Sequence, residues 1–275
     1  MRQIRSALFM PASNARAIEK ARELECDAVI LDLEDAVAPE AKAAARAQAV
    51  AAARQGGFGD RLLVLRVNAL DTDWGKEDCA AAIGAGFAAV LLPKVSRPDD
   101  LTAARAILGE LPLWTMVETC AAMLALPSIA ATPGLACLIA GTNDLAKDMR
   151  CTPGADRLPL LPHLTAIVTV ARAYGILALD GVSNVLADTP ALAAECAQGA
   201  AFGFDGKTLI HPAQIAPTNR AFAPSAERVA WAQAVIAAFA DPVNADKGAI
   251  RIGGEMVERL HLAEAERILQ NASPL

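Results

Sequence analysis

The sequence predicts a (β/α)8 barrel, also called a TIM barrel, followed by a C-terminal helical extension. Eight short runs rich in leucine or β-branched residues alternate with alanine-rich stretches of helical length, as in folds built from parallel strands and crossover helices. Polar and charged residues follow almost every run, where a barrel places its functional groups. With 275 residues, the chain is long enough for one such barrel and an additional segment.

The expected strands are short, and the chain between them is long enough for one helix each. They are Ser6–Phe9, Ala28–Asp32, Leu62–Val67, Ala88–Leu92, Leu113–Glu118, Ala136–Ala140, Ile176–Asp180 and Ala201–Asp205. The stretch Pro98–Leu108 illustrates the helices, because it opens with two aspartates and then carries apolar residues at helical spacing. After the sixth strand, residues 146–162 contain a glycine and three prolines, which predicts an irregular loop.

The barrel is expected to occupy residues 1–222 and the helical extension residues 223–275. Two amphipathic helices are predicted in the extension, Ala226–Phe239 and Met256–Leu269. Residues 241–254 between them are polar and contain glycine, so we expect a hinge there. The last helix would then act as a lid or contact a neighbouring subunit.

Several other classes of fold and partner are disfavoured. A doubly wound open sheet is the rival fold, but the first strand leads into Pro-Ala-Ser-Asn and no glycine-rich nucleotide-binding turn occurs. The net charge of −6 argues against a nucleic-acid or membrane-surface partner. Residues 119–143 lack charge, but Pro127 and Pro133 divide them, which predicts helix, turn and buried strand rather than a membrane span.

The cysteines and the N-terminal residues predict a cytoplasmic protein. The six cysteines include no Cys-x-x-Cys pair and no metal-type spacing, so we interpret them as reduced thiols. The first residues do not form the apolar core and small-residue cleavage site of a signal peptide.

The expected strand ends carry the side chains from which an active site would be built. They are Asp32, Glu34, Asp35, Arg66, Asn68, Lys94, Glu118, Asn143, Asp144, Asp180, Lys207 and His211. Glu118 and Asp144 follow consecutive strands, and neighbouring strands lie about 5 Å apart, so both carboxylates could reach one ion. Two carboxylates without a nearby His or Cys cluster suit Mg²⁺ better than Zn²⁺. The alternative is that both acids only cap helices.

The remaining charged side chains are assigned mainly structural roles. Arg66 leaves an apolar run, where a guanidinium needs an anionic substrate or a partner such as Asp32 or Glu34. The Asp-Leu-Glu-Asp turn is best explained as scaffolding that orients arginines. Lys94 and Lys207 are expected to neutralise internal carboxylates, and His211 to make a structural hydrogen bond.

These residues belong to motifs that carry a family resemblance. The motifs are Arg5-Ser6, Val29–Pro39, Arg66-Val-Asn68, Leu92-Pro-Lys94, Met116-Val-Glu118-Thr119, Gly141-Thr-Asn-Asp144-Leu145, Gly203–Lys207 and Ile210-His-Pro212. In these motifs and their order the chain resembles the citrate lyase β-subunit-like family of CoA-ester lyases, relatives of malyl-CoA and citramalyl-CoA lyases.

The resemblance implies a Mg²⁺-dependent barrel, with Mn²⁺ as a substitute, that reversibly cleaves a 3-hydroxyacyl-CoA thioester into an acyl-CoA and a 2-oxo acid. Glu118 and Asp144 would be the metal ligands, Glu118 also contacting the substrate, and Arg66 would bind substrate and act in catalysis. Lys20 matches a family lysine at the coenzyme A pocket. Asn14 stands where the family commonly has an arginine, for which Arg16 would substitute.

The C-terminal Met256-Val-Glu258 resembles a Met-Val-Asp of malyl-CoA lyases, where the aspartate acts as an acid in a neighbouring subunit's site. Glu258 would take that role here, and the protein would be a homotrimer or homohexamer. Three alternatives stay open. They are a citrate lyase β subunit acting on a citryl-carrier thioester beside its other subunits, a class II aldolase acting on free hydroxy-oxo acids, and a non-catalytic partner-binding barrel.

Overall fold

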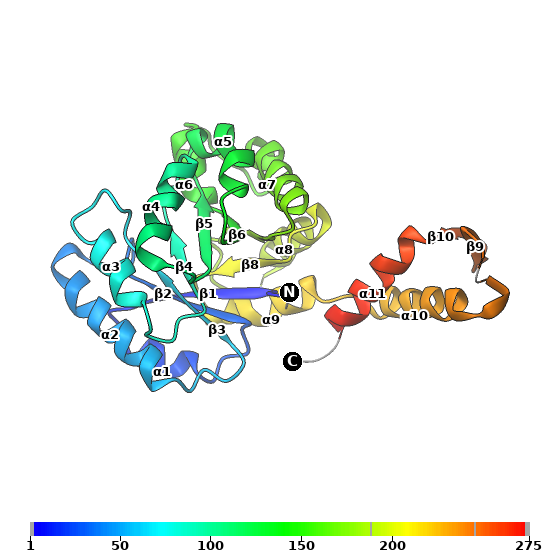
Figure 1. Cartoon of the computed structure of the whole chain (residues 1–275), viewed down its shortest axis with the longest axis horizontal. Coiled ribbons are helices and arrows are strands. Elements are labelled where there is room, and N and C mark those ends of the chain that lie inside the picture. Colours follow the sequence, from blue (N-terminus) through cyan, green and yellow to red (C-terminus); the bar gives the residue numbers. More distant parts are fainter. Residues whose placement is uncertain (1–2, 188, 245, 273–275) are drawn as a thin grey trace. The chain divides into compact units, whose positions relative to one another are not determined.

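The computed structural model describes residues 3–187, 189–244 and 246–272, and the described chain up to residue 222 contains a closed barrel of eight parallel strands (Figure 1). Each strand pairs with the next, and the eighth pairs with the first. The strands are β1 (Ser6–Pro11), β2 (Ala28–Asp32), β3 (Leu62–Arg66), β4 (Ala89–Leu92), β5 (Leu113–Val117), β6 (Leu135–Ala140), β7 (Leu177–Asp180) and β8 (Gly206–Leu209). The predicted (β/α)8 fold is confirmed.

Helices alternate with the strands and lie around the barrel (Figure 1). They are α1 (Ala15–Ala21), α2 (Lys42–Gln55), α3 (Gly75–Ala82), α4 (Pro98–Leu108), α5 (Cys120–Ala130), α6 (Thr142–Asp148), α7 (Leu161–Tyr174), α8 (Pro190–Phe202) and α9 (Ile215–Phe222), with short 3₁₀ turns η1 (Pro39–Ala41), η2 (Leu158–Leu160) and η3 (Pro212–Gln214). Side chains that accept backbone N–H groups begin several of them, including Asn14 at α1, Thr119 at α5 and Thr189 at α8.

The barrel strands are buried on both faces. In β2, Ala28 and Ile30 belong to the cluster inside the barrel, whereas Val29 and Leu31 pack in the cluster between strands and helices. Because both faces are covered, the strands are nearly continuous apolar runs, and polar groups occur mainly where strands end. This explains why most strands were predictable.

The eighth strand was predicted at the wrong place. Residues 201–205 contain the end of α8 and a turn at Gly203, whose φ of +91° ends the helix, and β8 begins only at Gly206. The real strand escaped notice because it carries Lys207 and Thr208 rather than an apolar run. Lys207 therefore lies within a strand and not after one.

The segment after β6 is more regular than predicted. Residues 146–162 include the second half of α6, the turn η2 and the start of α7, so the expectation of an irregular loop was only partly correct. No helix in the described parts of the chain is long and apolar enough to cross a membrane. All six cysteines lie in described segments and are free thiols.

The chain from Ala223 onward forms a second compact unit. It contains α10 (Ala226–Ala240), η4 (Pro242–Asn244), an antiparallel hairpin of β9 (Ala249–Ile252) and β10 (Glu255–Glu258), and α11 (Leu260–Ala272). Its helices and hairpin share a small core built around Ala232, Val235 and Val257.

The last helix begins later than predicted, because Met256 and Glu258 belong to β10. Gly253 and Gly254 form the tight turn of the hairpin, both with positive φ, which side-chain-bearing residues rarely adopt. The prediction of a hinge over residues 241–254 overlooked this glycine pair as a hairpin signal.

Candidate active site

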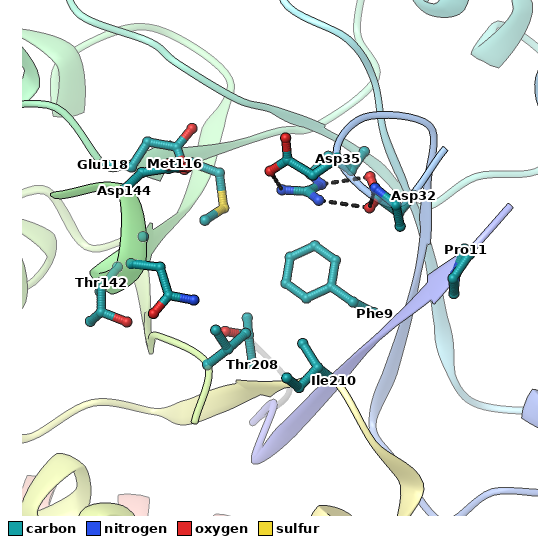
Figure 2. A pocket seen from close by; sticks show the side chains of 16 residues that line it. Phe9, Pro11, Asp32, Asp35, Met116, Glu118, Thr142, Asp144, Thr208 and Ile210 are labelled. Carbon is teal, nitrogen blue, oxygen red and sulfur yellow. Dashed lines mark hydrogen bonds and ion pairs between the residues drawn. The ribbon is translucent and has the colours of Figure 1, made fainter. Parts of the chain in front are cut away.

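A cavity of about 460 Å³ opens at the carboxyl ends of the barrel strands. Figure 2 shows Glu118 and Asp144 at one side of it and Asp32 at the other. The lining combines acids and one arginine with apolar side chains and includes Phe9, Asp32, Asp35, Arg66, Met116, Glu118, Asp144, Val182, Thr208 and Ile210. Strand ends from several parts of the chain therefore meet in one pocket, as a barrel predicts.

Glu118, directly after β5, is nearly buried, with 2% of its surface exposed. Its Oε1 accepts a hydrogen bond of 2.7 Å from the backbone N–H of Lys94. A Cβ atom at Gly141 would lie only 2.7 Å from Glu118 Oε2, so the glycine leaves the space that this carboxylate occupies. Burial raises the pKa of Glu118, and the charge of Lys94 opposes that rise.

Asp144 lies in the first turn of α6, after β6, with 35% of its side chain exposed. The Lys94 ammonium donates a hydrogen bond to Asp144, and its Nζ lies 3.4 Å from Glu118 Oε1. The structure thus brings Glu118 and Asp144 together around one lysine. Lys94 partners internal carboxylates, as predicted.

The donor set fits a magnesium ion better than a structural zinc. Within residues 3–187, 189–244 and 246–272, no group of three or more His, Cys, Asp or Glu side chains is placed to hold a metal. A pair of carboxylates is the sparse protein contribution typical of Mg²⁺, which keeps several waters or substrate oxygens. The buried Glu118 and the half-exposed Asp144 provide such a pair at the cavity wall.

Arg66, at the end of β3, lines the same cavity and is buried. Its Nε and Nη2 donate to the two oxygens of Asp32 at 2.7 and 2.6 Å, and its Nη1 lies 2.8 Å from Glu34 Oε2. The guanidinium also stacks over the ring of Phe9. Burial opposes its charge, but the hydrogen bonds to Asp32 raise the pKa of Arg66 above its ordinary value.

The Asp-Leu-Glu-Asp turn acts as the scaffold that the sequence predicted. Asp32 Oδ1 accepts the backbone N–H of Glu34 at 2.8 Å, while its other oxygen accepts that of Ala36 at 3.2 Å. The same two oxygens bind Arg66, so the turn fixes the guanidinium.

Lys42 holds this turn in place through hydrogen bonds to its backbone. Lys42 was not identified from the sequence. Its buried Nζ donates to the carbonyls of Leu33 and Glu34 and to Asn68 Oδ1, at 2.8, 3.0 and 2.7 Å. Its spacing in the sequence could have revealed this role, because Lys42 shares the buried face of α2 with Ala45 and other alanines.

Glu34 is a buried acid beside the arginine. Its burial raises the pKa to about 8, although the charge of Arg66 acts in the opposite direction. This carboxyl therefore keeps its proton to a higher pH than an exposed glutamate does.

A second group of charges links β7 and β8 to α8. Lys207, fully buried, lies 3.0 Å from Asp180 Oδ2 and 2.8 Å from Glu195 Oε1, and Arg157 Nη1 donates to both oxygens of Asp180. The predicted structural role of Lys207 is confirmed. His211 Nδ1 accepts the backbone N–H of Ala213, which is the structural hydrogen bond expected of it.

The other predicted site residues lie elsewhere. Arg16 and Lys20 are exposed on α1 and are absent from the described residues that line the cavity. Glu258 is exposed on β10 in the C-terminal unit. Arg66, Glu118 and Asp144 are thus the predicted site residues that share the cavity.

Curated relatives match the chain over nearly its whole length. A (3S)-malyl-CoA thioesterase of Cereibacter sphaeroides is 44% identical over 271 residues, covering 98% of this chain and 95% of the relative. The citrate lyase subunit beta of Leuconostoc mesenteroides is 30% identical, and the match covers 98% of this chain and 93% of that relative.

A solved structure with the same fold contains ligands. The protein CitE of Mycobacterium tuberculosis, in complex with magnesium, acetoacetate and coenzyme A, matches with a TM-score of 0.80 and 31% identity over 98% of each chain. The family model of HpcH/HpaI aldolase/citrate lyase matches residues 5–212, the stretch that supplies the cavity. The chain therefore belongs to the HpcH/HpaI aldolase/citrate lyase family.

Proposed function

We propose that this protein is a Mg²⁺-dependent carbon–carbon lyase that cleaves, or forms, a 3-hydroxyacyl-CoA ester, giving an acyl-CoA and a 2-oxo acid. The observation that carries the proposal is the meeting of Glu118, Asp144 and Arg66 in one cavity. Glu118 and Asp144 would hold the metal, and Mn²⁺ would substitute for Mg²⁺. The complex of the related CitE protein with magnesium, acetoacetate and coenzyme A supports the choice of ligands.

Arg66 would bind the anionic end of the substrate or the oxygen on which charge develops. A guanidinium has five N–H donors, and Asp32 and Glu34 fix its orientation before substrate arrives. Such preorganised charge stabilises the transition state without reorganisation. When bound, the metal supplies Lewis-acid stabilisation at the same cavity.

Hydrolysis of the thioester, which would release coenzyme A and a free 3-hydroxy acid, is a second candidate. It is favoured by the 44% identity to a (3S)-malyl-CoA thioesterase. Both reactions place negative charge on an oxygen of the same substrate class, so the same charged side chains would serve either. The role of a citrate lyase β subunit, which would act beside its other subunits, has weaker support from a relative at 30% identity.

The coenzyme A contacts and the assembly are also proposals. Arg16 and Lys20 would pair with phosphates of coenzyme A, because both are exposed cations on the helix that follows β1. Glu258 would act as an acid in a neighbouring subunit of a homotrimer or homohexamer. Its surroundings support an intersubunit contact, since Met256 and Leu260 expose 73% and 66% of their surface.

Product analysis with malyl-CoA and Mg²⁺ tests the proposed reaction. Carbon–carbon cleavage releases glyoxylate and keeps the thioester as acetyl-CoA, whereas hydrolysis releases a free thiol that a disulfide reagent detects. Glyoxylate without free thiol supports the lyase, and free thiol without glyoxylate supports the thioesterase. A panel of acyl-CoAs with glyoxylate, pyruvate and oxaloacetate extends the test to the reverse direction. Absence of every product would overturn the proposed function.

A further inference from the structure

We propose that the ammonium group of Lys94 occupies the cation position between Glu118 and Asp144 while no metal is bound, and that metal loading displaces it. The inference rests on the metal site of the proposed function and gives a role to a side chain outside the ligand pair. Lys94 Nζ contacts Asp144 and lies 3.4 Å from Glu118 Oε1. One positive charge therefore already faces both carboxylates.

A metal ion and this ammonium would compete for the same oxygens. Like charges separated by about 4 Å repel strongly even at a protein surface, so both cations cannot remain between the two acids. The Lys94 side chain is 37% exposed, which gives it a route into solvent without opening the core. Displacement therefore requires only a change of side-chain rotamer.

The local charge balance favours this exchange. Three carboxylates, those of Glu34, Glu118 and Asp144, act on Lys94. Glu34 is already paired with Arg66, but Glu118 and Asp144 set two carboxylates against one ammonium, and a divalent ion compensates such a pair better. The Lys94 ammonium would hold Glu118 and Asp144 together while the metal is absent, and metal binding would displace it.

The backbone of Lys94 serves a separate purpose. Its φ of +54° is a left-handed conformation, which is unfavourable for a residue with a side chain. In this conformation the backbone N–H donates to Glu118 Oε1 at 2.7 Å. The main chain therefore holds Glu118 whatever side chain stands at position 94. Methionine would bear the same backbone strain, so Lys94→Met removes the ammonium, with its charge and its hydrogen bond to Asp144, and leaves the backbone strain as it is.

The test measures Mn²⁺ binding by the electron paramagnetic resonance signal of the free ion. Wild type is compared with Lys94→Met, the charge-retaining Lys94→Arg, and Lys147→Met, which removes an exposed charge from α6 one turn beyond Asp144. We expect Lys94→Met to lower the Kd by about tenfold or more, which corresponds to about 1.4 kcal/mol. Lys94→Arg and Lys147→Met should change the Kd by less than about threefold.

Thermal unfolding provides a second readout that does not depend on activity. In a chelator, Lys94→Met should melt below wild type, because the buried Glu118 loses its cation partner. Mg²⁺ should then raise the Tm of Lys94→Met more than that of wild type. If Lys94→Met does not fold, Lys94→Gln replaces it in both measurements.

A Glu118→Gln variant separates failure of this inference from failure of the metal site. If wild type binds Mn²⁺, Glu118→Gln does not, and Lys94→Met binds no more tightly than wild type, the Lys94 role is overturned while the metal site stands. If wild type and Lys94→Met both fail to bind Mn²⁺, the metal site of the proposed function is wrong, and this inference with it.

Discussion

At the residue scale, two acids of the cavity, Glu118 and Asp32, are held by backbone N–H groups before any ligand arrives. Glu118 accepts the amide of Lys94, and Asp32 accepts the amides of Glu34 and Ala36. Asp32 in turn clamps Arg66 through two hydrogen bonds. A site held in this way places its charges without spending binding energy on rearrangement.

Replacing Arg66 by lysine should lower kcat/KM by about 100-fold or more, because an ammonium cannot reproduce the planar two-point contacts of a guanidinium. Steady-state kinetics with malyl-CoA would measure the change, and circular dichroism would check that the barrel remains folded. Unchanged kinetics would contradict the role proposed for Arg66.

Glu34 should make the metal-free protein less stable as the pH rises. Burial raises its pKa from 4.5 to about 8, so between these values the folded protein keeps a proton that the unfolded chain has lost. The stability that the protonated Glu34 contributes is fully present below about pH 4.5 and is lost as the pH rises through 8. Glu34→Gln resembles the protonated acid and should lack this dependence.

Urea unfolding in a chelator at pH 5.5 and pH 8.5 would compare wild type with Glu34→Gln. From pH 5.5 to pH 8.5, the free energy of unfolding of wild type should fall by at least about 1 kcal/mol more than that of Glu34→Gln. A constant difference between the two proteins would show that Glu34 is ionised throughout.

Sequence reasoning found the acids and the arginine at strand ends but missed residues that hold the surrounding loops together. Gln214 is an example, because its buried amide joins two loops, accepting from the backbone of Ile210 and donating to the carbonyls of Ser183 and Val185. Such a residue carries no motif of its own. Its role depends on loops that come together only after the barrel closes.

At the scale of elements, the parallel strands were predictable because helices cover them outside and side chains fill the barrel inside. The exception, β8, shows the limit of this argument. Lys207 lies on the face of β8 that packs against α8, where Asp180 and Glu195 neutralise it, so the strand is buried without being apolar. Hydrophobic patterning cannot reveal a buried strand whose charge is balanced by distant residues.

Gly206 should be intolerant of even the smallest side chain, because the backbone just before β1 approaches it closely. A Cβ atom there would lie 1.9 Å from the carbonyl oxygen of Ile4. Gly206→Ala should therefore lower the free energy of unfolding by about 3 kcal/mol or more, at the upper end for overpacking.

Urea denaturation would measure this loss. Gly154→Ala is a matched control, because the added Cβ would meet only the flexible side chain of Asp156. Equal stabilities for the two variants would show that the backbone before β1 moves away from β8 more easily than this close approach suggests.

At the scale of the whole molecule, barrel closure brings together residues that are distant in the sequence, such as Arg66 and Asp144. The C-terminal unit has its own small core and carries Glu258 on an exposed strand. The family resemblance suggested a use for that strand in a neighbouring subunit, but no spacing rule in a single sequence specifies a partner copy.

If Glu258 acts in a neighbouring subunit, two inactive variants should complement each other. Glu258→Gln and Glu118→Gln would each be inactive alone, whereas co-expressed hybrids would regain activity at sites with Glu118 from one subunit and Glu258 from the next. Light scattering should show a trimer or hexamer. A monomer, or hybrids without activity, would contradict action between subunits.

We propose that Glu118 and Asp144 hold a catalytic divalent cation beside Arg66. Turnover of malyl-CoA by wild type, Glu118→Ala and Asp144→Ala, each assayed with Mg²⁺ and with a chelator, tests it most directly. We predict that wild type is active only with Mg²⁺ and that both variants stay folded by circular dichroism but inactive. Full turnover by either variant in the chelator would contradict the claim.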